Sequence, residues 1–189
     1  MESVLLVSST SKGADSLTML LKSNGYAQIL PVASGAEARR MAAQGNYGLV
    51  VINAPLSDEF GRELATSLTE TTSASVVLIV KNEVADDISA KVENYGVLVV
   101  GKPLSRPFFY QTLKLAAASR RRMLGLQKEN QKLQNKIEEI RLIDRAKCLI
   151  IENLGMSEPQ AHRYIEKKAM DSRVTRREIA QEILDQYEV

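Results

Sequence analysis

The chain has 189 residues, with 25 Lys and Arg against 23 Asp and Glu, one Cys, one His and no Trp. One Cys and one His exclude an intramolecular disulfide and a Cys/His zinc site, and apolar runs such as Val76–Val80 are too short to span a membrane. Because no signal peptide follows Met1, we expect a reduced, cytoplasmic protein with no membrane segment, no metal site and no cofactor.

Residues 1–118 are predicted to form an α/β domain. Stretches of helical periodicity separate five short runs rich in β-branched residues: Val4–Val7, Gln28–Val32, Leu49–Ile52, Val76–Val80 and Val97–Val100. Unbroken apolar runs are typical of strands buried on both faces, and their alternation with helices indicates βαβ units. We therefore expect a five-stranded parallel sheet.

Glycines and small polar residues predict where the helices of this domain begin and end. A left-handed residue often ends a helix, and three glycines follow helical stretches: Gly25, Gly45 and Gly96. Ser57 and Asp58 are candidate N-caps of the third helix, and Ser105 is a candidate N-cap of the fifth.

The residues that follow the runs are candidates for a functional crevice, because ligands of open parallel sheets bind beyond the carboxyl ends of the strands. The segment Val50–Gly61 and the triplet Gly101-Lys102-Pro103 resemble the receiver domain of two-component response regulators, which has a flavodoxin-like fold. The resemblance assigns the positions of the receiver pocket to residues of this chain. The phosphoacceptor position is Asn53, the acidic pair is Ser8 and Ser9, the hydroxyl position is Val80, the switch aromatic is Val99 and the lysine is Lys102.

These residue types do not support receiver chemistry. An amide such as Asn53 has no anionic oxygen with which to form an acyl phosphate, and Ser8 and Ser9 are poor ligands for Mg²⁺, which prefers carboxylates. We therefore expect no phosphotransfer and no catalytic residue, with Lys102 hydrogen-bonded to a nearby carbonyl instead. The resemblance implies control by a regulatory partner protein that itself responds to a ligand.

The chain is predicted to run as one helix from Arg106 to Leu154. Residues 119–141 of this helix carry a heptad with spacings of alternately three and four: Met123, Leu126, Asn130, Leu133, Ile137 and Ile140. The heptad predicts a coiled-coil dimerisation helix, and a single Asn at a core position favours a parallel two-stranded homodimer. The alternative is an isolated surface helix packed on its own domain.

Residues 142–189 are predicted to form a compact three-helix unit. Gly155 ends the first helix, and the capping boxes Ser157–Gln160 and Thr175–Glu178 begin the next two. Small residues indicate close helix packing around a core of Ala146, Ala161, Ala169 and Ala180. Cys148 lies one residue from the apolar stripe and is expected to pack there.

Three segments of this unit carry a second resemblance: Arg145–Ile150, Leu154–Glu158 with Ala161, and Ala169-Met170 followed by Ile179–Leu184. Together they resemble the ANTAR domain, the RNA-binding output domain of bacterial transcription antitermination regulators. The resemblance implies binding to hairpins of a leader transcript, which prevents a terminator from forming.

The charge of this region supports an RNA target. Residues 119–189 hold 15 Lys and Arg against 12 Asp and Glu, whereas residues 1–118 hold 10 against 11. The candidate RNA-binding residues cluster around the predicted turns: Arg145, Lys147, Arg163, Tyr164, Lys167, Lys168, Arg173, Arg176 and Arg177. The cations can contact phosphates, and Tyr164 and His162 offer rings on which a loop base can stack. The alternatives are core packing for Tyr164 and a plain surface position for His162.

Three other functions remain open at this point. They are a DNA-binding two-component response regulator with a helix-turn-helix output, a receiver active in phosphotransfer, and a dimeric adaptor whose basic end binds an acidic protein. Against the first, neither of the last two predicted helices has the Asn/Gln/Arg-rich N-terminal face that reads base edges in a major groove.

Overall fold

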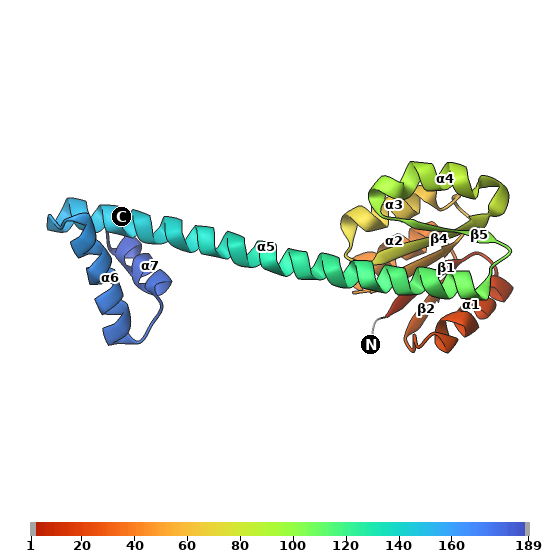
Figure 1. Ribbon diagram of the computed structural model, residues 1–189, viewed down its shortest axis with the longest axis horizontal. Helices are drawn as coiled ribbons and strands as arrows, with labels where there is room; N and C mark the ends of the chain where they lie inside the picture. The colour runs from red at the N-terminus through yellow and green to blue at the C-terminus, as the bar shows by residue number, and fades with distance from the viewer. Residues whose placement is uncertain (1–2, 188–189) are drawn as a thin grey trace. The chain divides into compact units, whose positions relative to one another are not determined.

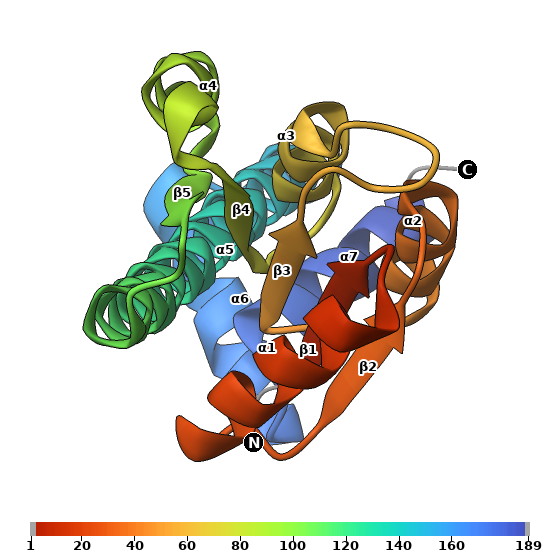
Figure 2. The ribbon, with the colours of Figure 1, turned by 90° about the vertical axis from the view of Figure 1, so that its right-hand side faces the viewer.

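The computed structural model describes residues 3–187, and the chain divides into two compact units between Gly125 and Leu126. The first unit contains five parallel strands, β1 (Val4–Ser8), β2 (Ile29–Val32), β3 (Leu49–Asn53), β4 (Ser75–Lys81) and β5 (Leu98–Lys102). Their order in the sheet, β2-β1-β3-β4-β5, is that of the flavodoxin-like fold (Figure 2). The predicted fold class is therefore confirmed.

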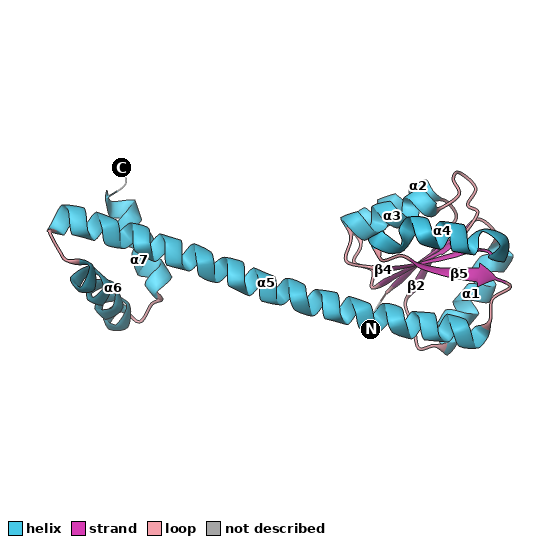
Figure 3. Ribbon diagram, turned by 45° about the horizontal axis from the view of Figure 1, so that its top comes forward, coloured by secondary structure: helices cyan, strands magenta, loops and turns pink. Residues whose placement is uncertain are grey.

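Helices cover both faces of this sheet (Figure 1 and Figure 3). The helix α1 (Ser11–Ser23) and the first turns of α5 (Arg106–Leu154) pack on one face. The other face is covered by α2 (Gly35–Gln44), α3 (Arg62–Thr71) and α4 (Ala85–Val92), with the short 3₁₀ turns η1 (Asn82–Val84) and η2 (Glu93–Tyr95) on either side of α4. Because both faces are covered, β1 and β3 consist of unbroken apolar runs up to their last residue.

The second unit consists of three helices: the C-terminal part of α5, α6 (Glu158–Ser172) and α7 (Arg176–Tyr187). Its core contains the four predicted alanines with Ile150, Ile165, Ile179 and Ile183. Small side chains let the helices approach closely, so the core is compact without any aromatic ring among its fully buried residues. No helix among residues 3–187 is both long enough and apolar enough to cross a membrane.

The predicted ends of these helices are confirmed. Gly155 follows α5 with a left-handed φ of 64° and donates its N–H to the carbonyl of Ile151. The Ser157 N–H donates to Gln160 Oε1 at 2.8 Å in a capping box that begins α6. At the start of α7, the Thr175 N–H donates to Glu178 Oε2 at 2.7 Å.

Three local predictions were wrong. Ser57 and Asp58 do not cap α3, which begins at Arg62 after Gly61, because the preceding loop is held on α2 instead. Gly45 is extended, with φ −119°, whereas Gly25 and Gly96 are left-handed as predicted. Cys148 is exposed, because the buried stripe of α5 runs through Ala146 and Ile150 and leaves the thiol on the outer side.

Candidate functional site

The candidate site of the first unit, which we call the crevice, is the edge of the sheet where β1 and β3 end side by side. Ser8 and Asn53 are register partners, and Asn53 Nδ2 donates to Ser8 Oγ at 3.0 Å. Ser8 Oγ in turn donates to the carbonyl of Thr10 at 3.2 Å. A Cβ at Gly13 would come within 2.7 Å of Asn53 Nδ2, so glycine lets α1 begin directly above this pair. The pair is therefore closely packed and electrically neutral.

Two lysines stand at the ends of the next two strands. Lys81 and Lys102 are register partners on β4 and β5, and Lys102 Nζ donates to the carbonyl of Ala54 at 2.6 Å. This bond confirms the predicted carbonyl partner. Burial lowers the pKa of Lys102, and the neighbouring positive charge of Lys81 lowers it further. Val80 is fully buried and Val99 partly buried, so neither presents a polar group to the crevice.

These residues do not fit the magnesium ion that receiver chemistry requires. Mg²⁺ takes carboxylates and water, but the crevice residues at the ends of β1 and β3 are hydroxyls and an amide. The nearby carboxylates of Asp58 and Glu59 are engaged elsewhere. Within residues 3–187, no group of three or more His, Cys, Asp or Glu side chains could hold a metal ion.

The loop after β3, residues 54–61, is fastened to the start of α2 by its acidic residues. Asp58 accepts from the N–H groups of Gly35 and Ala36, both at 2.9 Å, and these bonds hold the pKa of its carboxyl below the usual value. Glu59 binds the Arg39 guanidinium through two hydrogen bonds, of which the Nη2–Oε2 bond measures 3.0 Å. Asp58 thus supplies the negative charge that stabilises the N-terminus of α2. The sequence does not reveal this contact, because Asp58 lies more than twenty residues after the start of α2.

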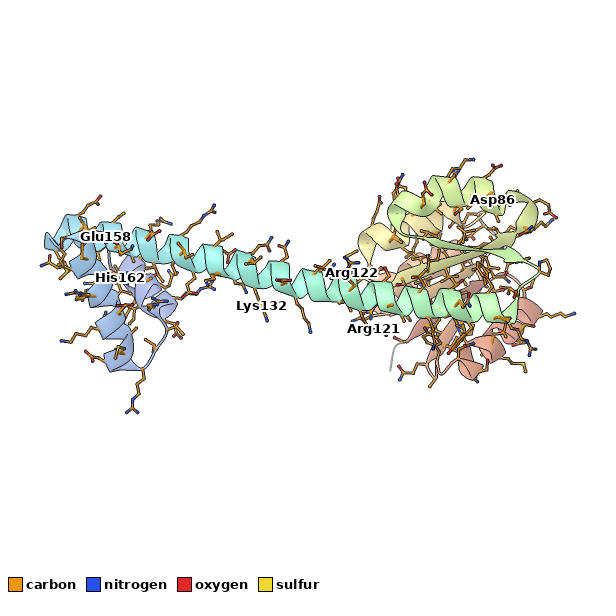
Figure 4. All side chains as sticks on the ribbon, viewed as in Figure 1. Asp86, Arg121, Arg122, Lys132, Glu158 and His162 are labelled. Atoms are coloured by element: carbon orange, nitrogen blue, oxygen red, sulfur yellow. The ribbon has the colours of Figure 1, made fainter. Side chains whose placement is uncertain are left out.

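Seven of the eight predicted RNA-binding cations fall into two groups, and the eighth, Arg145, is exposed on α5. Some pair with carboxylates: Lys147 bridges Asp144 and Glu158 at 2.8 and 2.9 Å, and Lys168 binds Glu182 at 2.9 Å. Arg176 approaches Glu166 at 3.5 Å. Figure 4 labels Glu158 near the start of α6 and His162 one turn further on.

Four other predicted RNA-binding cations have no carboxylate partner among the described residues, and all four are exposed: Arg163, Lys167, Arg173 and Arg177. We call these the unpaired cations. Arg163 and Lys167 are four residues apart on α6 and therefore share one face of that helix. Arg173 ends α6 with a left-handed φ of 56°, and Arg177 lies in the first turn of α7. Arg173 and Arg177 thus place positive charge at the α6–α7 turn, and Lys167 and Arg163 extend it along α6.

Apolar side chains accompany this positive surface. Tyr164 is 37% exposed and takes no place in the buried core, which favours a surface function over the alternative of core packing. Met170 is 79% exposed and Val174 is 40% exposed, on either side of Arg173. Sequence reasoning missed both. The sequence does hold one signal for a surface function: each is an apolar residue beside a polar turn, and neither lies on the helix face that carries the core alanines.

The heptad residues of α5 form a stripe that no part of the described chain covers. Met123, Leu126, Leu133, Ile137 and Ile140 are all more than half exposed. Exposed apolar residues at heptad spacing are what a second helix would bury.

Comparison with known proteins identifies the second unit. Residues 131–184 match the ANTAR domain family. The chain is similar to the transcriptional regulatory protein PdtaR of Mycobacterium tuberculosis, with 25% identity over 169 residues that cover 89% of this chain and 82% of the relative. It is also similar to the aliphatic amidase regulator of Pseudomonas aeruginosa, with 30% identity over 127 residues that cover 67% of this chain and 63% of that regulator.

Solved structures identify the fold of the first unit. The signal receiver domain of an HD domain-containing protein from Pseudomonas fluorescens Pf-5 matches with a TM-score of 0.59 and 20% identity, over 66% of this chain and 92% of that one. A CheY-like response regulator receiver domain protein from Methanospirillum hungatei JF-1 matches with a TM-score of 0.56 and 17% identity, over 65% of this chain and 98% of that one.

The chain thus combines a first unit that has the fold of a receiver domain, called the receiver-type domain below, with a second unit of which residues 131–184 match the ANTAR domain family.

The contacts of Asp58 generate a prediction about pH. Because the folded state lowers the pKa of Asp58, its ionised carboxylate stabilises the first unit at neutral pH, and this contribution is lost as pH falls through the folded pKa. We expect Asp58→Asn to lower the resistance of the first unit to urea at pH 7, with a difference from wild type that shrinks towards pH 3. Hydrogen exchange of the β1 and β3 amides over a urea series at each pH measures this difference in stability.

Asp15→Asn is the matched control, since Asp15 is exposed on α1 and makes no side-chain hydrogen bond or ion pair within the described chain. An equal effect of the two substitutions at every pH would contradict the assignment of Asp58 as the anion that stabilises the N-terminus of α2.

Proposed function

We propose that this protein is an RNA-binding transcription antitermination regulator that binds hairpins of a leader transcript through its ANTAR domain. The single observation that carries the proposal is the group of four unpaired cations on a domain that matches the ANTAR family. Phosphate contacts by such cations release counterions and supply much of the affinity for nucleic acid. A regulator that acts on transcripts as they are made works in the cytoplasm.

Hairpin RNA suits this surface better than duplex DNA. Loop bases of RNA are unstacked and bind to rings and guanidinium planes, which Tyr164 and the exposed arginines supply. A helix that enters the major groove of DNA presents base-reading residues at its N-terminus. The start of α6 instead has Glu158, whose carboxylate binds Lys147, and of the two arginines that begin α7, Arg176 approaches Glu166. We therefore propose hairpin RNA as the target, and duplex DNA is the comparison ligand in the binding experiment.

The protein binds RNA as a homodimer in this proposal. A parallel coiled coil of residues 119–141 would bury the exposed stripe that includes Leu133 and Ile137, with Asn130 setting the register. Two linked ANTAR domains would then raise the effective concentration of one RNA site once the other is bound.

Control comes from a regulatory partner protein rather than from phosphorylation. The neutral Ser8–Asn53 pair offers neither a phosphoacceptor nor magnesium ligands, and Lys102 is engaged with the Ala54 carbonyl. Loop 54–61 is fastened to α2 by Asp58 and Glu59 without any phosphoryl group. In this proposal the receiver-type domain serves as a docking scaffold for a partner that responds to a ligand.

The first prediction of this proposal concerns salt and charge. The full chain should bind hairpin RNA more tightly than duplex DNA, with an affinity that falls steeply with salt. Arg163→Gln with Lys167→Gln should weaken RNA binding about tenfold or more at physiological salt, and it should flatten the log–log salt slope by about 0.7–0.9 for each phosphate that is no longer neutralised. Fluorescence anisotropy with labelled RNA over a salt series measures both.

The matched control is Lys147→Gln with Lys168→Gln, which removes the same charge from lysines already paired with carboxylates. We expect a smaller decrease in affinity from this pair. Equal affinity for RNA and DNA, or no affinity for either, would rule out the proposed function.

The second prediction concerns the dimer. Leu133→Glu with Ile137→Glu should give monomers in sedimentation velocity and weaken RNA binding by about tenfold or more, because avidity is lost. Gln131→Glu with Asn135→Glu adds the same charges away from the heptad and should leave the dimer intact. Dimers that persist in the first variant would refute the coiled coil.

The third prediction concerns phosphorylation. Incubation with acetyl phosphate and Mg²⁺ should leave the intact mass of the protein unchanged. Asn53→Asp alone should also stay unmodified, because Ser8 and Ser9 cannot hold the metal. A phosphoryl adduct on any Asp of the wild-type receiver-type domain would contradict control without phosphorylation.

A further inference from the structure

A shallow open pocket of about 500 Å³ lies beside the α6–α7 turn. Its lining consists of Glu166, Ala169, Met170, Arg173, Val174 and Arg176. The volume lies within the roughly 300–1,000 Å³ range of small-ligand pockets. All six residues belong to the second unit, so the pocket is complete within the three-helix domain.

The walls of this pocket are apolar and its position is fixed. Met170 and Val174 are exposed although neither is needed for the core. The backbone between them is held, because the Val174 N–H donates to the Ala169 carbonyl at 3.1 Å and the Arg173 N–H to the Met170 carbonyl at 3.3 Å. A thioether beside a branched methyl group forms a flat, polarizable surface on which an aromatic ring can stack.

The rim of the pocket carries charge of both signs. Arg173 has no carboxylate partner in the described chain, and Arg177 lies just beyond it in the first turn of α7. Glu166 also lines the pocket, and its Oε1 approaches Arg176 Nη1 at 3.5 Å and His162 Nε2 at 3.3 Å. Both of these contacts use the same oxygen of Glu166, which leaves Oε2 available as an acceptor.

We propose that this pocket binds one unstacked base of the RNA loop between Met170 and Val174, with Arg173 on the adjoining phosphate and Glu166 accepting from an exocyclic amine of that base. The inference rests on the proposed function and names the feature of the RNA that the domain recognises. Charge complementarity favours an RNA base as the ligand of this pocket. An apolar ring flanked by anionic phosphates matches an apolar pocket beside unpaired cations.

The proposal also assigns a chemical class to the base. A carboxylate accepts hydrogen bonds and cannot donate them at neutral pH. Adenine, cytosine and guanine carry an exocyclic amine that donates to such an oxygen, whereas the donor of uracil is a ring N3–H that lies between two carbonyl oxygens, and these repel a carboxylate. The pocket should therefore discriminate against uracil at one position of the loop.

The experiment uses the full chain and hairpin RNAs selected for binding from a pool with a randomised loop. Each loop nucleotide of one selected hairpin is replaced in turn by an abasic residue. For wild-type protein, one abasic position should lower the affinity about tenfold, as expected when a stacked base is removed. For Met170→Ala with Val174→Ala, the intact hairpin should bind about tenfold more weakly, and the abasic replacement at that position should weaken binding no further.

Two further variants sharpen the test. Leu154→Ala removes an exposed apolar side chain outside the pocket and should retain the full abasic penalty. Glu166→Gln should bind the selected hairpin and its uracil-substituted form with similar affinity, because an amide can donate as well as accept.

The possible failures are distinguishable. If wild-type protein binds no hairpin RNA, the proposed function fails and this inference with it. If RNA binds with the expected salt dependence, but the abasic penalty is the same in wild type and in the Met170/Val174 variant, the pocket is not the base site and only the inference is overturned.

Discussion

The close packing of α5, α6 and α7 over four alanines is the constraint on which the rest of the second unit depends. Ala146, Ala161, Ala169 and Ala180 are buried, so the helix backbones can approach without an intervening large side chain. A core this small has no room for a charged group, and every Lys and Arg head of the domain must lie outside it. The packing therefore fixes both the α6–α7 turn and the cations around it.

The pairing of charges then separates structural cations from candidate ligand-binding ones. Lys168 binds Glu182 on α7, and such an exposed pair adds little to stability but reduces the positive charge that RNA can meet. The unpaired cations keep their full charge at the same turn. The function proposed for this domain follows from that difference and does not depend on the total charge, which is only +2 for the chain.

Much of the fold could be predicted from the sequence, because its signals are local. Apolar runs predicted the strands, and the capping residues Ser157 and Thr175 marked the starts of α6 and α7 within a few residues. The error at Ser57 and Asp58 concerns a contact between distant residues. Asp58 meets the amides of Gly35 and Ala36 only after the sheet brings the two loops together. For the same reason, the sequence could not separate paired from unpaired cations, and the position of Met170 and Val174 beside a polar turn did not show that they line a pocket.

Ultraviolet crosslinking of the full chain to the transcripts that copurify with it tests the central claim most directly, when mass spectrometry locates the crosslinked peptides. The account predicts crosslinks within the segment from Arg163 to Arg177, and none in the receiver-type domain. Crosslinks confined to residues 1–125, or their absence from the α6–α7 turn while RNA remains bound, would contradict it.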